Sequence, residues 1–550
     1  TFQGYAFNDD YTANQNIQRA VWFIPNNNES NPLYGNVLTK YFKNGFYIQN
    51  RPELIAANLR TLSVQYLTSD IETSEENTYA FASVEIGKDV TNPFLIRTSE
   101  EFNTYNKDSA VTTGGETKQY NYLRFVSDIS FNNTDLKADT FTIDYSGDID
   151  GNGMDISNLR LVSNSDFEEE DPDLLTRLGL FGSITSRIVN GEVVERGIVR
   201  NLNINVSEVK ATNVTYVGVL AGIISDASVF NININSTLSD NIEGRNIVGG
   251  LAGYISGESE IVNITSNVKA RANYYTAENL YSAANPTASV GKFYLYNKNE
   301  IGGVKNYEEI VNRNNVSYVG GIAGIIDVDS RDFVNQNSLR SARARRLTVT
   351  GGFNLIGEVA GGIFGGTGET TMVSDLNVIV NNSSVIQSTR IAGGVIGDNR
   401  GTVSRSAIRH ETETQNLIDA ELKAAVDGGT AINNSLQNVN TIFRGNPIYI
   451  GGFIGINYNG NIEHSYSKVN VININSMYGG GFIGLATGGS LSKVYASGSV
   501  YTHKISSGLI AVLTENKLAT LINNPNNQYV SYIINSGGIV NKNSDSLCIA

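Results

Sequence analysis

The chain has 550 residues, of which 40% are hydrophobic and only 17% are charged, with 40 Lys and Arg against 54 Asp and Glu. The net charge of −14 argues against a nucleic-acid partner, because phosphate binding requires a basic surface. The single cysteine, Cys548, excludes an intrachain disulfide. No apolar run approaches the about 18 residues of a transmembrane helix.

Residues 1–92 lack the repeat that fills the rest of the chain, and we interpret them as a small, mainly β head or cap. One short helix is predicted at 52–60, with Pro52 in its first turn. An uncapped solenoid end would expose a sheet edge and apolar core, so a cap has a physical purpose here.

The solenoid is predicted to begin at Pro93. Thr98 is followed three residues later by Glu101, which is a capping-box pattern and predicts a short capping helix. Strand-like segments follow, among them Phe141 to Asp155.

The segment Asp148-Ile149-Asp150-Gly151-Asn152-Gly153 matches the start of an EF-hand calcium loop. The twelfth position would be Leu159 instead of the bidentate Glu that such a loop requires. A plain Asp-Gly-Asn-Gly turn is the first interpretation. A structural calcium held by Asp148, Asp150 and Asp155 in another geometry is the alternative, and no other cofactor is expected.

An internal repeat dominates the chain from residue 179 onward, and its clearest copy is Gly451-Gly452-Phe453-Ile454-Gly455. Further copies start at Gly249, Gly320, Gly361, Gly393 and Gly480, and degenerate copies lie at 179–182, 218–222 and 508–511. Each glycine inside a strand costs roughly 0.5–1 kcal/mol relative to alanine. Three in five residues therefore indicate close approach of another backbone or a tight bend, as at a solenoid corner.

The repeat spacing and the strands between its copies predict a β-helix. From Gly451 to Gly480 the interval is 29 residues, and longer intervals contain insertions. Segments such as Ile232-Asn233-Ile234-Asn235 alternate apolar and polar residues, which is typical of a strand with one face in a core and one in water.

The run from Gly451 to Val469, with Gly-Gly-Phe-Ile-Gly, Asn-Gly-Asn-Ile and Ser-Tyr-Ser-Lys-Val, resembles the GLUG repeat of large secreted bacterial adhesins and of the non-catalytic part of some IgA peptidases. The resemblance covers roughly residues 93–510. It implies an all-β, right-handed parallel β-helix and a surface or secreted location, and it implies no catalytic activity.

Three stretches, 271–315, 327–348 and 409–447, interrupt the repeat and are predicted to be insertions, which leave a solenoid on one face and often form its binding face. A helix is predicted at 416–426. The candidate binding residues in the insertions are Tyr274, Tyr275, Tyr281, Arg343, Arg345 and Arg346. For the arginines, a solvated insertion is the first interpretation. The alternatives are contact with an acidic glycan or with an acidic patch on a neighbouring copy, or a protease-sensitive site.

An enzyme on the same scaffold, a polysaccharide lyase or glycosidase, is the runner-up. It would need clustered carboxylates along one groove, and the densest acidic group within the repeats is Asp327, Asp329 and Asp332. The three histidines have no partner at metal-ligand spacing, and motifs such as HExxH or GxSxG are absent. A non-catalytic spacer of a larger secreted protein is a third possibility.

The sequence therefore predicts a head at 1–92, a β-helix at 93–504 with three insertions, and a C-terminal cap or last coils at 505–550. We expect a non-catalytic, extracellular or cell-surface adhesin or structural element. Its expected partners are a surface glycan, a protein or further copies of itself.

Overall fold

The structure is a computed structural model. It describes residues 93–102, 121–131, 136–137, 144–162, 177–189, 192–212, 214–236, 242–273, 316–327, 341–411, 442–473, 475–502, 505–513 and 534–535, and the backbone of four strands nearer the N-terminus. These four strands form a separate antiparallel sheet in the order β2-β1-β3-β4. Their bounds are β1 (Arg19–Phe23), β2 (Leu38–Lys40), β3 (Thr61–Leu67) and β4 (Ala80–Glu85).

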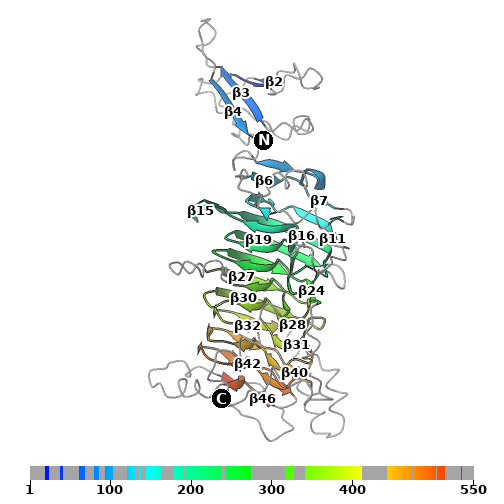
Figure 1. The fold of residues 1–550 in the computed structure, drawn as a ribbon, viewed down its shortest axis with the longest axis vertical. Coiled ribbons are helices and arrows are strands. Elements are labelled where there is room, and N and C mark those ends of the chain that lie inside the picture. The colour runs from blue at the N-terminus through cyan, green and yellow to red at the C-terminus, as the bar shows by residue number, and fades with distance from the viewer. Residues whose placement is uncertain are drawn as a thin grey trace, which may run out of the picture.

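The remaining strands build a parallel β-helix, which confirms the predicted fold class (Figure 1). One of its sheets has ten strands, one from each successive coil. These strands are β9 (Asp144–Tyr145), β13 (Phe181–Thr185), β18 (Ala221–Ser225), β22 (Ala252–Ser256), β26 (Ala323–Ile326), β29 (Phe364–Thr367), β32 (Ile396–Asn399), β37 (Ile454–Asn457), β42 (Ile483–Ala486) and β47 (Ile510–Leu513). At the usual strand spacing of about 4.8 Å, ten stacked coils span roughly 43 Å.

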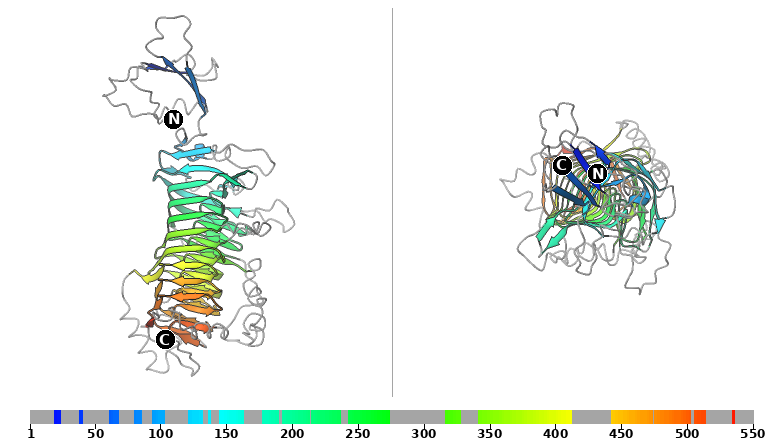
Figure 2. Two further views of the ribbon diagram at one scale, coloured as in Figure 1. Left: turned by 90° about the vertical axis from the view of Figure 1, so that its left-hand side faces the viewer. Right: turned by 90° about the horizontal axis from the view of Figure 1, so that it is seen from above.

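The other walls belong to one 30-stranded sheet that bends around the coil (Figure 2). We call its first part the long wall. The long wall contains β6 (Asn121–Phe125), β10 (Gly147–Asp150), β11 (Asp155–Val162), β16 (Ile198–Lys210), β19 (Ser228–Ser236), β23 (Glu260–Ser266), β27 (Arg343–Val349), β30 (Met372–Val380), β33 (Thr402–Ser404), β34 (Ala407–His410), β38 (Asn461–Glu463), β39 (Tyr466–Lys468), β43 (Ser490–Ser492) and β44 (Tyr495–Ala496).

The part of this sheet that leads into the glycine corners consists of β12 (Arg177–Leu178), β17 (Tyr216–Gly218), β20 (Ile242–Gly244), β21 (Ile247–Gly249), β24 (Lys269–Ala272), β25 (Tyr318–Gly320), β28 (Asn354–Gly361), β31 (Val385–Gly393), β35 (Phe443–Gly445), β36 (Tyr449–Gly451), β41 (Tyr478–Gly480) and β46 (Ile505–Ser507). The same sheet includes β5 (Phe94–Ile96), β7 (Ile129–Ser130), β8 (Leu136–Lys137) and β48 (Ile534–Asn535). Two small pairs, β14 (Arg187–Val189) with β15 (Glu192–Glu195) and β40 (Val471–Asn473) with β45 (Val500–Thr502), complete the described strands.

The glycine corners stack directly on one another. Gly249 pairs with Gly320, then Gly361, Gly393, Gly451 and Gly480 follow in register. A Cβ on Gly452 would lie 2.1 Å from the carbonyl oxygen of Gly481 in the next coil. Close backbone approach therefore explains the glycines, as predicted. The insertions leave the register unchanged.

The capping helix predicted near Thr98 is present as helical residues 99–102. The Thr98 hydroxyl accepts the Glu101 N–H at 3.1 Å, and the Glu101 carboxylate accepts the Arg97 N–H at 2.7 Å. This turn places Phe102 against Phe125 and Phe181, with ring centroids 5.8 Å apart in both pairs. Phe102 is fully buried, so the turn closes the first coils of the core.

The described strands correct the boundaries expected for the insertions. β24 continues to Ala272, β34 to His410, and β35 begins at Phe443. β27 begins at Arg343, so placing residues 343–348 in an insertion was wrong. The helices predicted at 52–60 and 416–426 lie outside the described residues. Across the described ranges, no helix has the length and apolarity needed to cross a membrane.

Candidate functional site

One residue in each of eight successive coils adopts a left-handed backbone conformation on the long wall. We call these residues the corner column: Asn201 (φ 57°), Asn231 (54°), Asn263 (57°), Arg346 (57°), Asp375 (56°), Arg405 (47°), His464 (49°) and Lys493 (52°). Their flanking residues pair in register, as Val262 with Arg345 and Ile264 with Leu347 show. Asn and Asp tolerate this conformation, whereas it costs other residues of the order of 1–2 kcal/mol.

The corner column explains why β27 was missed in the sequence. A left-handed residue inserts one position into the alternation, so two successive side chains point outward. In β27, Ala344 and Leu347 are buried, whereas Arg345 and Arg346 between them are exposed. The alternation of buried and exposed residues is therefore interrupted at Arg346. For this reason the sequence of residues 343–348 did not predict a strand.

Arg343, Arg345 and Arg346, which we call the basic corner patch, lie together on β27 and are all exposed. The Arg345 guanidinium lies 3.1 Å from the Glu260 carboxylate of the preceding coil, and its side chain remains 54% exposed. The structure thus brings these three predicted binding residues together on the shaft. Tyr274, Tyr275 and Tyr281 lie outside the described residues.

Further charged residues continue the corner column below the patch. Arg405 donates two hydrogen bonds of 2.9 Å to the two carboxylate oxygens of Asp375 in the coil above. These bonds hold the pKa of Asp375 below its usual value, although partial burial opposes them. His464 is half-exposed, and its Nδ1 lies 3.8 Å from the Glu463 carboxylate.

The Arg405–Asp375 pair should make stability depend on pH. Because the pKa of Asp375 is lowered in the folded chain, its contribution is present above the unfolded value of about 3.8 and is lost as pH falls through the lower folded pKa. We expect Asp375→Asn to lower the melting temperature slightly at pH 7, and the difference from wild type to close in strong acid. Parallel melting curves across pH 2–7 measure this, and a difference independent of pH would contradict it.

The upper half of the same wall carries ladders of amide side chains. Asn263 Nδ2 donates to Asn231 Oδ1 at 2.8 Å, and Asn231 Nδ2 donates to Asn201 Oδ1 at 2.9 Å. A second ladder links Asn233 to Asn203 at 2.8 Å. These residues were not singled out from the sequence, although the repeated Asn-x-Asn of β16 and β19 is the signal that marks them.

Two of the three aspartates considered for calcium, Asp150 and Asp155, lie at the upper ends of these ladders. Asp150 Oδ1 accepts a hydrogen bond from Asn201 Nδ2 at 3.1 Å, and Asp155 Oδ1 accepts one from Asn203 Nδ2 at 2.9 Å. Asp150 Oδ1 also accepts the Asn152 N–H at 3.0 Å, which closes the plain turn.

Asp148 is buried and accepts a hydrogen bond from Arg200 Nη1 at 2.7 Å. Burial raises the pKa of Asp148, and the Arg200 contact opposes that rise. Within the described ranges, no group of three or more His, Cys, Asp or Glu side chains is placed to hold a metal ion.

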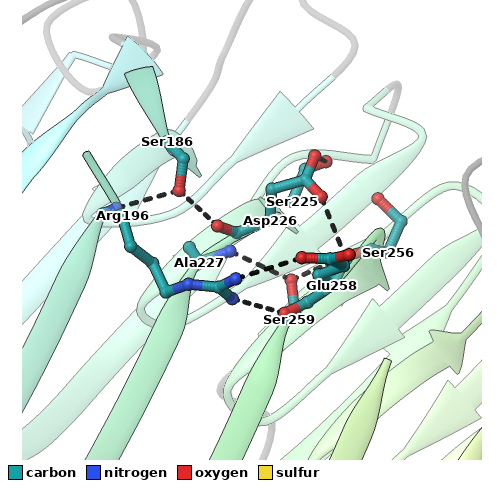
Figure 3. A network of polar contacts seen from close by, with 9 residues as sticks. Ser186, Arg196, Ser225, Asp226, Ala227, Ser256, Glu258 and Ser259 are labelled. Carbon is teal, nitrogen blue, oxygen red and sulfur yellow. Dashed lines mark hydrogen bonds and ion pairs between the residues drawn. The ribbon is translucent and has the colours of Figure 1, made fainter. Parts of the chain in front are cut away.

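A polar network ties three coils together where the ten-stranded sheet passes into the long wall (Figure 3). Arg196 reaches past the intermediate coil and donates to the carbonyl oxygen of Glu258 at 2.5 Å. In the coil between them, Asp226 Oδ1 accepts the Glu258 N–H at 2.9 Å. The Ser186 hydroxyl donates to the Asp226 carbonyl oxygen and accepts the Gly197 N–H. Because its groups bond to one another and to backbone, we assign this network a structural role.

A hollow of about 280 Å³ lies beyond the far end of the long wall strands. Acidic and basic side chains from successive coils line it. Lys210 pairs with Glu243 at 3.3 Å within the lining, and Glu208 pairs with the neighbouring Arg160 at 2.9 Å. Lys269 and Arg271 complete its charged lining. Paired charges of both signs favour no single charged ligand.

Comparison with known proteins gives one family match. Residues 446–472 match the family model described as the GLUG motif. No curated protein and no solved structure matches the chain. The matched segment spans β36 to the first residues of β40, and its glycine corner stacks in register with the corners above and below. The chain is therefore a parallel β-helix that carries a GLUG motif in one of its coils.

Proposed function

We propose that this chain is a non-catalytic, extracellular or cell-surface adhesin that binds an acidic glycan through the basic corner patch. The observation that carries the proposal is the clustering of Arg343, Arg345 and Arg346 on one strand of a chain whose net charge is −14. A solenoid shaft supports such a role because it holds a binding surface rigidly and at a distance from an attachment point.

The chemistry of the patch favours carboxylate or sulfate groups. Guanidinium groups bind such planar or branched anions in a bidentate manner and stay charged at every physiological pH. The arrangement of the side chains also supports the proposal. Because Arg346 has a left-handed backbone, its side chain points outward next to that of Arg345, and both are exposed. Clustered charge of one sign attracts a polyanion more strongly than isolated charges do.

The proposal predicts salt-sensitive binding to acidic polysaccharides. The purified chain should be retained on immobilised polygalacturonate or a sulfated polysaccharide at low salt and released as salt rises. The triple variant Arg343→Gln, Arg345→Gln, Arg346→Asn should bind at least about tenfold more weakly, since three charge-assisted contacts are lost. Asn is used at Arg346 because it tolerates the left-handed backbone.

The matched control is Lys210→Gln, Lys269→Gln, Arg271→Gln, which removes the same charge from the hollow. It should bind as wild type does. Equal loss in both variants would show that net charge alone governs retention and would contradict the proposal. Sedimentation and electron microscopy of the same samples, dilute and concentrated, distinguish glycan binding from self-association. If the wild-type chain forms filaments and the triple variant of the basic corner patch does not, the acidic partner is a second copy of the chain.

A further inference from the structure

We infer that the upper long wall is a second, independent binding face that takes an extended neutral polysaccharide lying along the axis of the rod. The face consists of outward side chains after the corner column on five successive strands, β16, β19, β23, β27 and β30. The ribbons of these strands stack on one another in Figure 1. We call these side chains the Asn/Thr array: Asn203, Asn205, Asn233, Asn235, Thr265, Thr348 and Asn377.

The register brings these residues into two rows. Asn203, Asn233, Thr265, Thr348 and Asn377 are successive Cα partners across five coils. This first row therefore repeats every coil, about 4.8 Å. The second row, Asn205 and Asn235, covers the first two coils and lies two residues away, about 6.6 Å. The residues between them, such as Ile204 and Ile234, are buried, so the array stands on a rigid core.

The array is uncharged, although charged side chains border it on both sides. The basic corner patch lies before it on β27, and the charged hollow lies beyond Asn205 on β16. An amide or hydroxyl array offers a charged ligand no compensation for lost hydration. It matches a neutral ligand whose hydroxyl groups both donate and accept hydrogen bonds.

The side chains are already ordered before a ligand arrives. Asn233 donates to Asn203 at 2.8 Å and Asn235 donates to Asn205 at 3.3 Å. Each link uses one N–H of the donating amide, which leaves its second N–H for a ligand. Thr265 and Thr348 are β-branched and stiff, and each offers a methyl group beside its hydroxyl. Such order lowers the entropy cost of binding.

The geometry selects a polysaccharide over other neutral ligands. The face is an open sheet surface, whereas small molecules bind in concave pockets. Its backbone groups are already paired between coils, so a peptide cannot add as a further strand. The rise of one sugar residue in an extended β-linked chain is close to the coil spacing. Successive sugars can therefore meet equivalent side chains, with ring C–H groups on the threonine methyls.

The test is affinity electrophoresis of the full chain in gels that contain hydroxyethyl cellulose, galactomannan or, as the acidic comparison, polygalacturonate. We expect retardation by a neutral polymer that persists at high salt. The double variant Asn233→Asp, Asn235→Asp should weaken it about tenfold, because two near-isosteric charges would then be desolvated beneath the ligand. With neutral β-linked oligosaccharides, affinity should rise up to about five sugars, one for each strand of the array, and then level off.

The matched control is Asn231→Asp. Asn231 lies in the corner column and donates to Asn201 in the same kind of ladder. The corner column already contains an aspartate in another coil, Asp375. The control variant should leave retardation unchanged, and melting curves check that all variants fold. Two results would overturn the inference: no retardation by either neutral polymer, or equal weakening by Asn231→Asp. The corner-patch variant should retain neutral binding, so the two faces fail separately.

Discussion

Replacing Gly451 by alanine should disrupt the coil that carries the GLUG motif and destabilise the chain by about 3 kcal/mol or more. A Cβ on Gly451 would lie 1.7 Å from the Ile454 carbonyl oxygen and 2.8 Å from the Phe482 carbonyl oxygen of the next coil. Both obstacles are backbone atoms, one within the same corner and one in the next coil, so they cannot rotate away as a side chain would. Relief would require that the corner open and that two stacked coils separate.

Urea unfolding followed by far-ultraviolet circular dichroism measures this effect as a lower midpoint, or as loss of soluble protein. The matched control is Gly352→Asn. Gly352 has φ 88°, and a Cβ there would meet only the Ser383 hydroxyl at 3.7 Å. Asn accepts a left-handed backbone, so this variant should stay near wild type. If Gly451→Ala unfolds at the wild-type urea concentration, close backbone approach does not explain the repeated glycines.

Replacing Arg390 by methionine should cost about 3–5 kcal/mol, because it leaves a buried carboxylate without its cation. The Arg390 Nε lies 3.0 Å from Glu358 Oε1, and the side chains of Arg390 and Glu358 are 3% and 2% exposed. Glu358 Oε2 also accepts the Ser317 N–H at 2.9 Å. The pair therefore links β28 and β31 to the segment that precedes β25.

The double variant Arg390→Met, Glu358→Gln distinguishes two causes of the lost stability, namely poorer packing and a buried charge without a partner. Glutamine keeps an oxygen for the Ser317 N–H but carries no charge, so most of the lost stability should return. Thermal and urea unfolding of wild type, both single variants and the double variant form a complete cycle. A double variant no more stable than Arg390→Met would mean that packing, and not charge burial, dominates at this position.

The sequence predicted the fold because its strongest signals arise from contacts that recur in every coil. Glycines such as Gly320 and Gly393 are required at every corner, because a Cβ there would meet first the carbonyl oxygen three residues further along the chain and then the backbone of the next coil. The spacing of the glycines therefore shows the coil period directly. The capping helix was predictable for a related reason, since Thr98 and Glu101 satisfy backbone groups within one turn. Both signals depend on residues close together in the chain.

The candidate site could be predicted only in part. The arginines of the basic corner patch were singled out as a basic cluster, but they were assigned to a loop because the left-handed Arg346 shifts the alternation by one. The amide ladders pair residues about 30 positions apart, such as Asn203 with Asn233, and no local pattern reports that distance. Only the stacked register shows that these side chains meet.

By itself, the sequence determined the parallel β-helix, its glycine corners and its first-coil cap, because each follows from backbone sterics and local hydrogen bonding. The tertiary structure decided which polar residues share a face. Stacking places Asp150 and Asp155 against Asn201 and Asn203, so they contact amides instead of one another. Stacking also brings the neutral side chains of the Asn/Thr array together on the upper long wall, next to the arginines of the basic corner patch. Residues of one column come from different coils, which the insertions separate in sequence but not in space.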